Sequence, residues 1–221
     1  MGLSLRGMGS EITQTPFSLP IPNILCQNFR MNRLLILPVL LLTLLVGTPA
    51  FSADFLKGYT AYKSGDYATA LREWTPLAKQ GNAVAQNNLG VMYGNGQGVP
   101  QNSMTAVKWY RLAAKQGYAK SQYNLGNLYG KGEGVPQDYK TAVKWYRLAA
   151  DKGLAPAQNS LGLMYGNGWG VQQDYKTAAK WYRLAAEQGY AESQYNLGQL
   201  YRRGEGVPQD YKTAVKWYRL A

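Results

Sequence analysis

The chain has 221 residues, of which 46% are hydrophobic, and it carries a formal net charge of +12. It contains no histidine and a single cysteine, which excludes a Ser-His-Asp triad, most zinc sites and an internal disulfide framework. The apolar content suffices for a continuous core, and the surplus of basic side chains favours solubility or an anionic partner.

Residues 31–53 have the pattern of a secretory signal peptide. Met31-Asn32-Arg33 is a short basic start, and a 13-residue apolar run follows from Leu34 to Val46. The run is shorter than the roughly 20 residues of a spanning helix, and small residues follow it. We therefore expect cleavage after Ser52 or Ala53 and an exported protein, either periplasmic or secreted. The alternative is an uncleaved signal that anchors the protein in a membrane.

Residues 1–30 precede this pattern and are rich in Ser, Thr, Pro and Gly. We interpret them as a non-structural N-terminal extension that results from a mis-assigned start, with Met31 as the first residue. Cys26 lies in this extension. Beyond residue 53 the chain has 21 basic and 11 acidic residues, a net charge of +10. The exported part is thus expected to be basic and free of disulfides.

Residues 54–81 are expected to form a helix pair. The turn Ser64-Gly65-Asp66 separates two helical patterns, and the second pattern carries Ala70, Trp74 and Ala78 at a spacing of four. This segment lacks the Gly-rich loop of the sequence that follows. We expect it to cover the N-terminal end of a repeat array.

The rest of the chain repeats itself every 36 residues. One tryptophan recurs in each copy, at Trp109, Trp145, Trp181 and Trp217. The 18-residue block that begins at Gly132 returns unchanged at Gly204. Such a period indicates a supersecondary unit copied in tandem, because one unit alone cannot bury its apolar face. The expected repeats are 82–117, 118–153, 154–189 and 190–221.

Each repeat is predicted to hold two antiparallel helices, which makes the chain an all-α solenoid. In the second copy the first helix covers 119–129, and a loop with three glycines and a proline ends it. Asp138 is the expected N-cap of the second helix, which runs to about Asp151, and Gly153 terminates it. Gly126 is expected to let the two helices approach closely. The expected inward face of the second helix is Ala142, Trp145, Tyr146, Ala149 and Ala150.

These residues resemble the Sel1-like repeats, which are relatives of the tetratricopeptide repeat. The family pattern is carried by Ala119, Gln122, Leu125-Gly126, Tyr129, Gly132, Gly134-Val135, Asp138, Ala142, Trp145-Tyr146, Ala149-Ala150 and Gly153. The resemblance covers residues 82–221, and residues 54–81 match the tetratricopeptide pattern in part. It implies a right-handed solenoid that acts as an adaptor or scaffold, with secreted bacterial members that engage envelope or host proteins.

The sequence favours a protein that is not an enzyme and that holds no cofactor and no metal. Histidine, the usual general base, is absent, and the sequence contains no Ser-x-x-Lys motif. The Asp and Glu residues are not arranged so that two carboxylates would share one site. The loops at 94–98 and 130–134 lack the strand and the Lys-Ser or Lys-Thr of a phosphate-binding loop, so we interpret them as turns. A penicillin-binding, β-lactamase-like or cell-wall-related activity is the distant alternative, since some cysteine-rich members of the family are linked to it.

A basic ridge is predicted along the second helices, because Lys and Arg recur there at spacings of three and four. Its members are Lys108, Arg111, Lys140, Lys144, Arg147, Lys176, Lys180, Arg183, Lys212, Lys216 and Arg219. The ridge is interpreted either as a solvated face or as a docking surface for anionic lipid, polysaccharide or an acidic protein. Nucleic acid is not an expected partner of an exported protein.

A partner-binding face is predicted on the first helices, at positions that vary between copies. These residues are Asn87, Asn88, Tyr123, Asn124, Asn159, Ser160, Tyr195 and Asn196. Asn and Tyr suit peptide recognition because they offer amide hydrogen bonds and flat contact area. The sequence thus predicts a protein–protein interaction scaffold of the bacterial envelope, or a secreted effector, and the alternative is a basic module for an anionic surface.

Overall fold

A computed structural model of the protein describes residues 48–221, which form ten α-helices and no strand. The helices are α2 (Thr48–Lys63), α3 (Tyr67–Lys79), α4 (Ala83–Asn95), α5 (Ser103–Lys115), α6 (Ala119–Lys131), α7 (Tyr139–Ala150), α8 (Ala155–Asn167), α9 (Tyr175–Glu187), α10 (Ala191–Arg203) and α11 (Tyr211–Tyr218).

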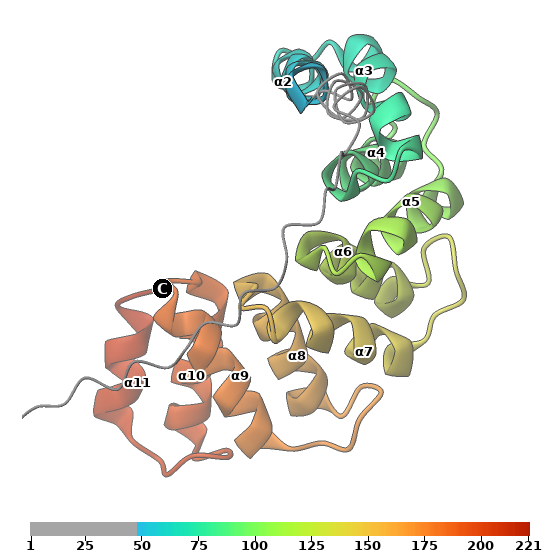
Figure 1. Ribbon diagram of the computed structural model, residues 1–221. Coiled ribbons are helices and arrows are strands. Elements are labelled where there is room, and N and C mark those ends of the chain that lie inside the picture. Colours follow the sequence, from blue (N-terminus) through green and yellow to red (C-terminus); the bar gives the residue numbers. More distant parts are fainter. Residues whose placement is uncertain (1–47) are drawn as a thin grey trace, which may run out of the picture. The chain divides into compact units, whose positions relative to one another are not determined.

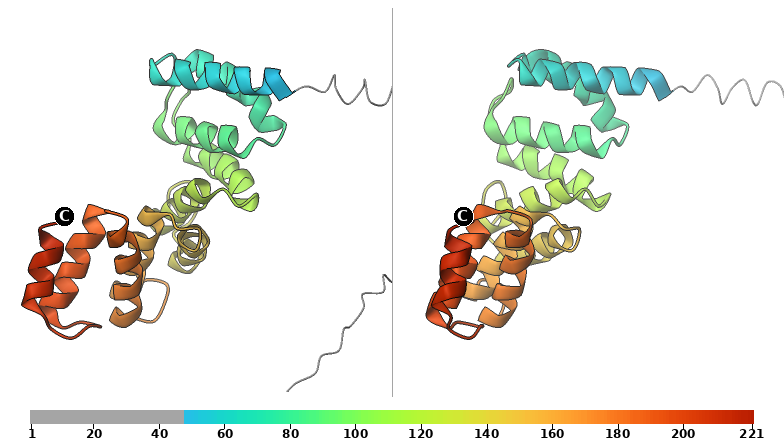
Figure 2. Two further views of the ribbon diagram at one scale, coloured as in Figure 1. Left: turned by 60° about the vertical axis from the view of Figure 1, so that its left-hand side comes forward. Right: turned by 90° about the vertical axis from the view of Figure 1, so that its left-hand side faces the viewer.

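The helices pack in chain order, each against the one before and the one after it (Figures 1 and 2). We call the first helix of each repeat an A helix (α4, α6, α8 and α10) and the second a B helix (α5, α7, α9 and α11). The helix pair of α2 and α3 precedes them, with Trp74 buried in its core, as the sequence predicts. The described part of the chain is therefore an all-α solenoid.

The helix ends confirm the predicted turn chemistry. The Asp138 carboxylate accepts a hydrogen bond of 3.0 Å from the backbone N–H of Thr141 at the start of α7. Asn102, Asp174 and Asp210 cap the other B helices in the same way. Gly153 has a φ of 82° and so terminates the repeat in the left-handed conformation that glycine tolerates. The capping Asp and Asn side chains thus accept hydrogen bonds from backbone N–H groups that have no partner within the first turn of a helix.

Each A helix meets its B helix at a glycine. A Cβ atom placed on Gly126 would lie 2.6 Å from Cε1 of the Tyr146 ring, and Gly90, Gly162 and Gly198 face a tyrosine in the same manner. The Tyr146 hydroxyl donates a 2.8 Å hydrogen bond to Asn127 on α6. The close approach that the sequence predicts at this glycine is therefore filled by a tyrosine ring.

The expected inward face of the B helix needs one correction. Tyr146 is 7% exposed and lies in the core of its repeat, whereas Trp145 is only half-buried. Val143, which the prediction omits, is buried as well. Trp145 packs against an apolar cluster formed by α5 of the preceding repeat and α6 of its own. The indole thus connects repeats, and the phenol fills the interior of one repeat.

The proposed extension and most of the proposed signal peptide lie outside the described residues. The last six residues of the predicted signal peptide, 48–53, belong to α2. None of the helices described is both long enough and apolar enough to cross a bilayer.

The glycine contact predicts opposite effects for two substitutions on the same helix. Gly126→Ala forces a methyl group into the Tyr146 ring, and we expect a loss of about 1–3 kcal/mol in the free energy of unfolding. Gly130→Ala is the matched control, because its Cβ would lie 3.5 Å from the nearest side-chain atom, an ordinary contact. It should leave stability unchanged or raise it by up to about 1 kcal/mol. Urea unfolding of both variants checks this, and equal losses would contradict it.

The aspartate caps predict acid sensitivity. The hydroxyl and then the backbone N–H of Thr141 hold the pKa of Asp138 below its ordinary value, and the corresponding threonines do the same for Asp174 and Asp210. Because the folded pKa lies below the unfolded value of about 3.9, this stabilisation is complete above that value and is lost as the pH falls through the folded pKa.

The triple variant D138N/D174N/D210N should keep its caps, because Asn102 already caps α5. Its melting temperature should fall less than that of the parent between about pH 5 and pH 2. Asp151→Asn, at a residue that caps no helix start, is the control and should follow the parent curve. Parallel curves for the parent and the triple variant would show that the caps do not carry the acid response.

Candidate functional site

Buried polar side chains connect neighbouring A helices. The Asn87 Oδ1 atom on α4 accepts hydrogen bonds from the Ser121 hydroxyl (2.9 Å) and from the Asn124 Nδ2 atom (3.3 Å) on α6. Asn87 is 6% exposed and Ser121 is fully buried. The side-chain amide of Asn87 therefore joins two neighbouring repeats by hydrogen bonds, and it fixes the orientation of the half-buried Asn124.

The same constellation connects α8 to α10. Asn159 Oδ1 accepts from the Ser193 hydroxyl at 2.8 Å and from Asn196 Nδ2 at 3.2 Å. The sequence assigns Asn87 and Asn159 to a partner-binding face, whereas the structure buries both at the junctions between repeats, at 6% and 5% exposure. Asn159 also lines a second cavity, together with Tyr195 and Asn196. The 36-residue period alone does not predict this burial, because it does not show which polar side chains of neighbouring repeats contact each other.

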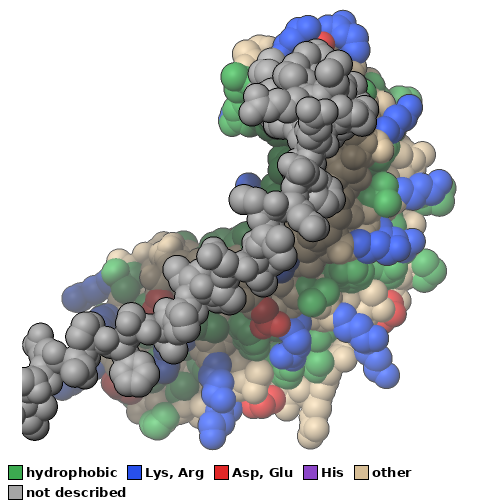
Figure 3. Space-filling model, viewed as in Figure 1, with side chains coloured by type: hydrophobic (Ala, Val, Ile, Leu, Met, Phe, Trp, Pro, Cys, Tyr) green, Lys and Arg blue, Asp and Glu red, His purple; other side chains and the backbone are tan. Residues whose placement is uncertain are grey.

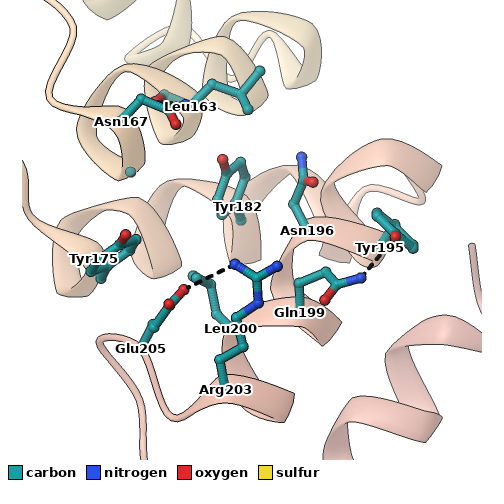
Figure 4. A pocket seen from close by; sticks show the side chains of 11 residues that line it. Leu163, Asn167, Tyr175, Tyr182, Tyr195, Asn196, Gln199, Leu200, Arg203 and Glu205 are labelled. Atoms are coloured by element: carbon teal, nitrogen blue, oxygen red, sulfur yellow. Dashed lines mark hydrogen bonds and ion pairs between the residues drawn. The ribbon is translucent and has the colours of Figure 1, made fainter.

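A groove of about 300 Å³ lies between α8 and α10 (Figure 4). Leu163 and Asn167 of α8 and Tyr182 of α9 line it on one side. The other lining side chains are Tyr195, Asn196, Gln199, Leu200, Arg203, Glu205 and Tyr175. Figure 4 shows Gln199 and Arg203 of α10 lying between Tyr175 and Tyr195. Two of the eight predicted partner-binding residues, Tyr195 and Asn196, thus meet in this groove.

The polar wall of the groove is held in place by its own hydrogen bonds. Gln199 donates to the Tyr195 hydroxyl at 2.7 Å and accepts from the Arg202 guanidinium at 2.9 Å. Arg203 lies 3.8 Å from Glu205, so the charge at the rim is balanced. The groove consequently offers fixed amides, exposed aromatic surface and little net charge, and Tyr195 is 50% exposed.

Gln199, Arg203 and Asn167 were not predicted as site residues. Gln199 and Arg203 follow Asn196 at spacings of three and seven, which puts all three on one face of α10. That spacing could have identified them from the sequence. Asn167 could not be found in this way, because it lies at the end of a different helix.

The other predicted partner-binding residues lie on A helices but do not line this groove. Tyr123 packs on the Tyr146 ring with 6.0 Å between ring centroids. Asn88 lines a separate cavity of about 110 Å³ together with Tyr59, Tyr62, Trp74 and Val91. Ser160 is half-buried on α8.

Every residue of the basic ridge is exposed. Figure 3 shows Lys and Arg side chains along the margin over α5 and α7. Arg111 donates to the hydroxyl of Tyr129 at 2.9 Å and Arg183 to that of Tyr201 at 2.7 Å, and Arg147 contacts Tyr165 likewise. Within residues 54–221 no carboxylate lies within 4.0 Å of a ridge side chain. No ridge residue lines the groove.

The described part of the chain brings no three Cys, Asp or Glu side chains together in a geometry that could hold a metal ion. In the groove the only carboxylate is Glu205. Burial raises the pKa of the Tyr182 hydroxyl well above its ordinary value, so this group stays protonated at neutral pH and cannot serve as a base.

The sequence profile of the Sel1 repeat matches residues 83–118, 119–154, 155–190 and 191–221. A Sel1 repeat protein from Oxalobacter formigenes is 40% identical, with a TM-score of 0.71, over 75% of this chain and 68% of that one. A protective antigen of uropathogenic Escherichia coli with an SLR fold is also 40% identical, with a TM-score of 0.74. That match covers 83% of this chain but only 40% of the antigen. No curated protein matches the chain.

The buried junction predicts a specific loss of stability. Ser193→Ala removes a fully buried hydroxyl that donates to Asn159, and we expect the free energy of unfolding to fall by about 1 kcal/mol. Ser121→Ala should cost a similar amount at the equivalent junction. Ser160→Ala is the control, because Ser160 is half-buried on α8 and belongs to neither triad. Thermal unfolding of the three variants checks this, and an equal loss in the control would refute the role of the junction.

Proposed function

Because the chain belongs to the Sel1 repeat family, whose members generally mediate protein–protein interaction, we propose that it is a non-enzymatic adaptor. We place its partner-binding site in the groove between α8 and α10. The observation that carries the proposal is the wall of fixed amides and exposed tyrosine in that groove. Such a wall suits an extended peptide segment, which needs hydrogen-bond partners for its backbone and flat apolar contact for its side chains.

The chemistry of the groove supports binding and not catalysis. Burial keeps the Tyr182 hydroxyl protonated, the one carboxylate in the groove is paired with Arg203, and histidine is absent from the whole sequence. The groove therefore offers no free base set beside a separate acid.

The place of action proposed is the bacterial envelope or the exterior of the cell. Residues 31–53 support this, because their basic start, apolar run and small residues have the pattern of an export signal. The relatives that share 40% identity are bacterial proteins, and one of them is described as a protective antigen.

The basic ridge supports a second candidate function, docking on anionic lipid or polysaccharide. Its side chains are all exposed, and the exposed leucines Leu148 and Leu184 lie beside Arg147 and Arg183. A surface of exposed charges weakens steeply with salt, whereas a neutral groove responds little. Salt dependence thus separates the two functions.

Photo-crosslinking distinguishes the two surfaces directly. We expect Tyr195→p-benzoylphenylalanine to crosslink the full chain to one dominant protein from a bacterial envelope and secretome extract, at low and at moderate salt. The matched probe at Lys144, on the ridge, should give no such band. A band from position 144 alone that vanishes with salt would favour the ridge. The absence of a crosslinked band at both positions would reject the adaptor function.

A further inference from the structure

The A helices alternate between two sequence types. The helices α4 and α8 read AVAQNNLGVMYGN and APAQNSLGLMYGN, and α6 and α10 read AKSQYNLGNLYGK and AESQYNLGQLYRR. The true period of the A-helix surface is therefore two repeats, or 72 residues. The B helices differ far less between copies, so the longer period is chiefly a property of the A helices.

The hydrogen bonds follow the longer period. The triad of Asn, Ser and Asn connects α4 to α6 and α8 to α10, with distances that agree within 0.1 Å. At the intervening junction from α6 to α8 the triad cannot form, because Tyr123 stands in the place of Asn87 and Ala157 in the place of Ser121. Two repeats thus make one unit, and the chain contains two such units.

The residues that line the groove have counterparts in the first unit. Tyr123, Asn124 and Asn127 on α6 stand 72 residues before Tyr195, Asn196 and Gln199. The ion pair at the rim recurs as well. Lys131 lies 3.9 Å from Glu133, and Arg203 lies 3.8 Å from Glu205. Both surfaces carry a paired rim, amides and a tyrosine in the same order, and Arg202 adds one positive charge beside the second surface.

We infer that the chain carries two equivalent peptide sites, one on α4 and α6 and one on α8 and α10, and that its partner presents the same short uncharged segment twice. This inference rests on the proposed function. Neutral rims disfavour a charged segment, and the matching amides select the same backbone geometry at each site. Two linked segments bind more tightly than one, because the second association becomes intramolecular.

The two sites differ in ways that set their order of affinity. Ser103 stands where Tyr175 flanks the second site, so the first site lacks that aromatic wall. Asn127 accepts a hydrogen bond from Tyr146, whereas Gln199 is bound to Tyr195 and Arg202 at the surface of the groove. The site on α8 and α10 is accordingly the tighter one.

The test uses a peptide selected from a phage-displayed library of random 12-residue sequences against the full chain. Isothermal titration of the single peptide should give two sites per chain. Tyr195→Ala should remove the tighter site and Tyr123→Ala the weaker one. Because Tyr123 also packs on Tyr146 and Tyr195 on Tyr218, the exposed Lys131→Glu and Arg203→Glu provide second variants, which should weaken one site each at least several-fold. Asp151→Asn, at the C-terminal end of α7 and outside both sites, should leave both intact.

A tandem peptide with two copies joined by a flexible linker should bind about 10²-fold tighter than one copy, and either single-site variant should abolish that gain. One site per chain that depends on Tyr195 and ignores Tyr123, or no gain at any linker length, would overturn the duplication while the adaptor function stands. Failure to select any peptide whose binding depends on Tyr195 would reject the adaptor function and the duplication together.

Discussion

The contact on which the rest of this fold depends is the glycine of each A helix against the tyrosine ring of its B helix. At Gly126 the missing Cβ lets Tyr146 lie directly on the backbone of α6. This close crossing buries the phenol and turns Trp145 toward the flank, where it packs on the preceding repeat. Of these two adjacent aromatic residues, Tyr146 thus packs within its repeat and Trp145 contributes to the packing between repeats.

The two ends of each A helix have different roles: the first turns hold the stacking, and the later turns reach the surface. Near its start, the Gln194 side chain donates a 3.0 Å hydrogen bond to the carbonyl of Ala186, at the end of the preceding B helix. Gln122 and Gln158 do the same in their repeats, and Gln86 donates to Ala78 at the end of α3. These buried amides satisfy helix-terminal carbonyls and fix the stacking. The remainder of α10, which holds Asn196, Gln199 and Arg203, is free to line the groove.

The sequence alone predicted the structure correctly where a residue type has a single structural role. Asp138 could only cap a helix, Gly153 could only end one, and the 36-residue period required stacked helix pairs. It did not predict which side chains are buried where burial depends on the helix face that a neighbouring helix covers. Trp145 and Tyr146 are adjacent and both aromatic, so periodicity alone did not decide between them. Asn87 was misplaced for the same reason, since its partner Ser121 lies 34 residues away.

If the proposed groove binds the partner, the charged ridge can still act at an earlier stage of the same association. Exposed lysines act over a distance of about a Debye length, roughly 8–10 Å, and raise the rate of encounter with an acidic partner. They contribute little to the lifetime of the complex, because exposed charges are screened. The groove has no such reach, but its fixed amides discriminate between bound segments at hydrogen-bond distance. Since no ridge residue lines the groove, the two properties can change independently. Under the proposed adaptor function, a substitution on α9 at Lys180 would alter the rate of association, and one on α10 at Tyr195 the rate of dissociation.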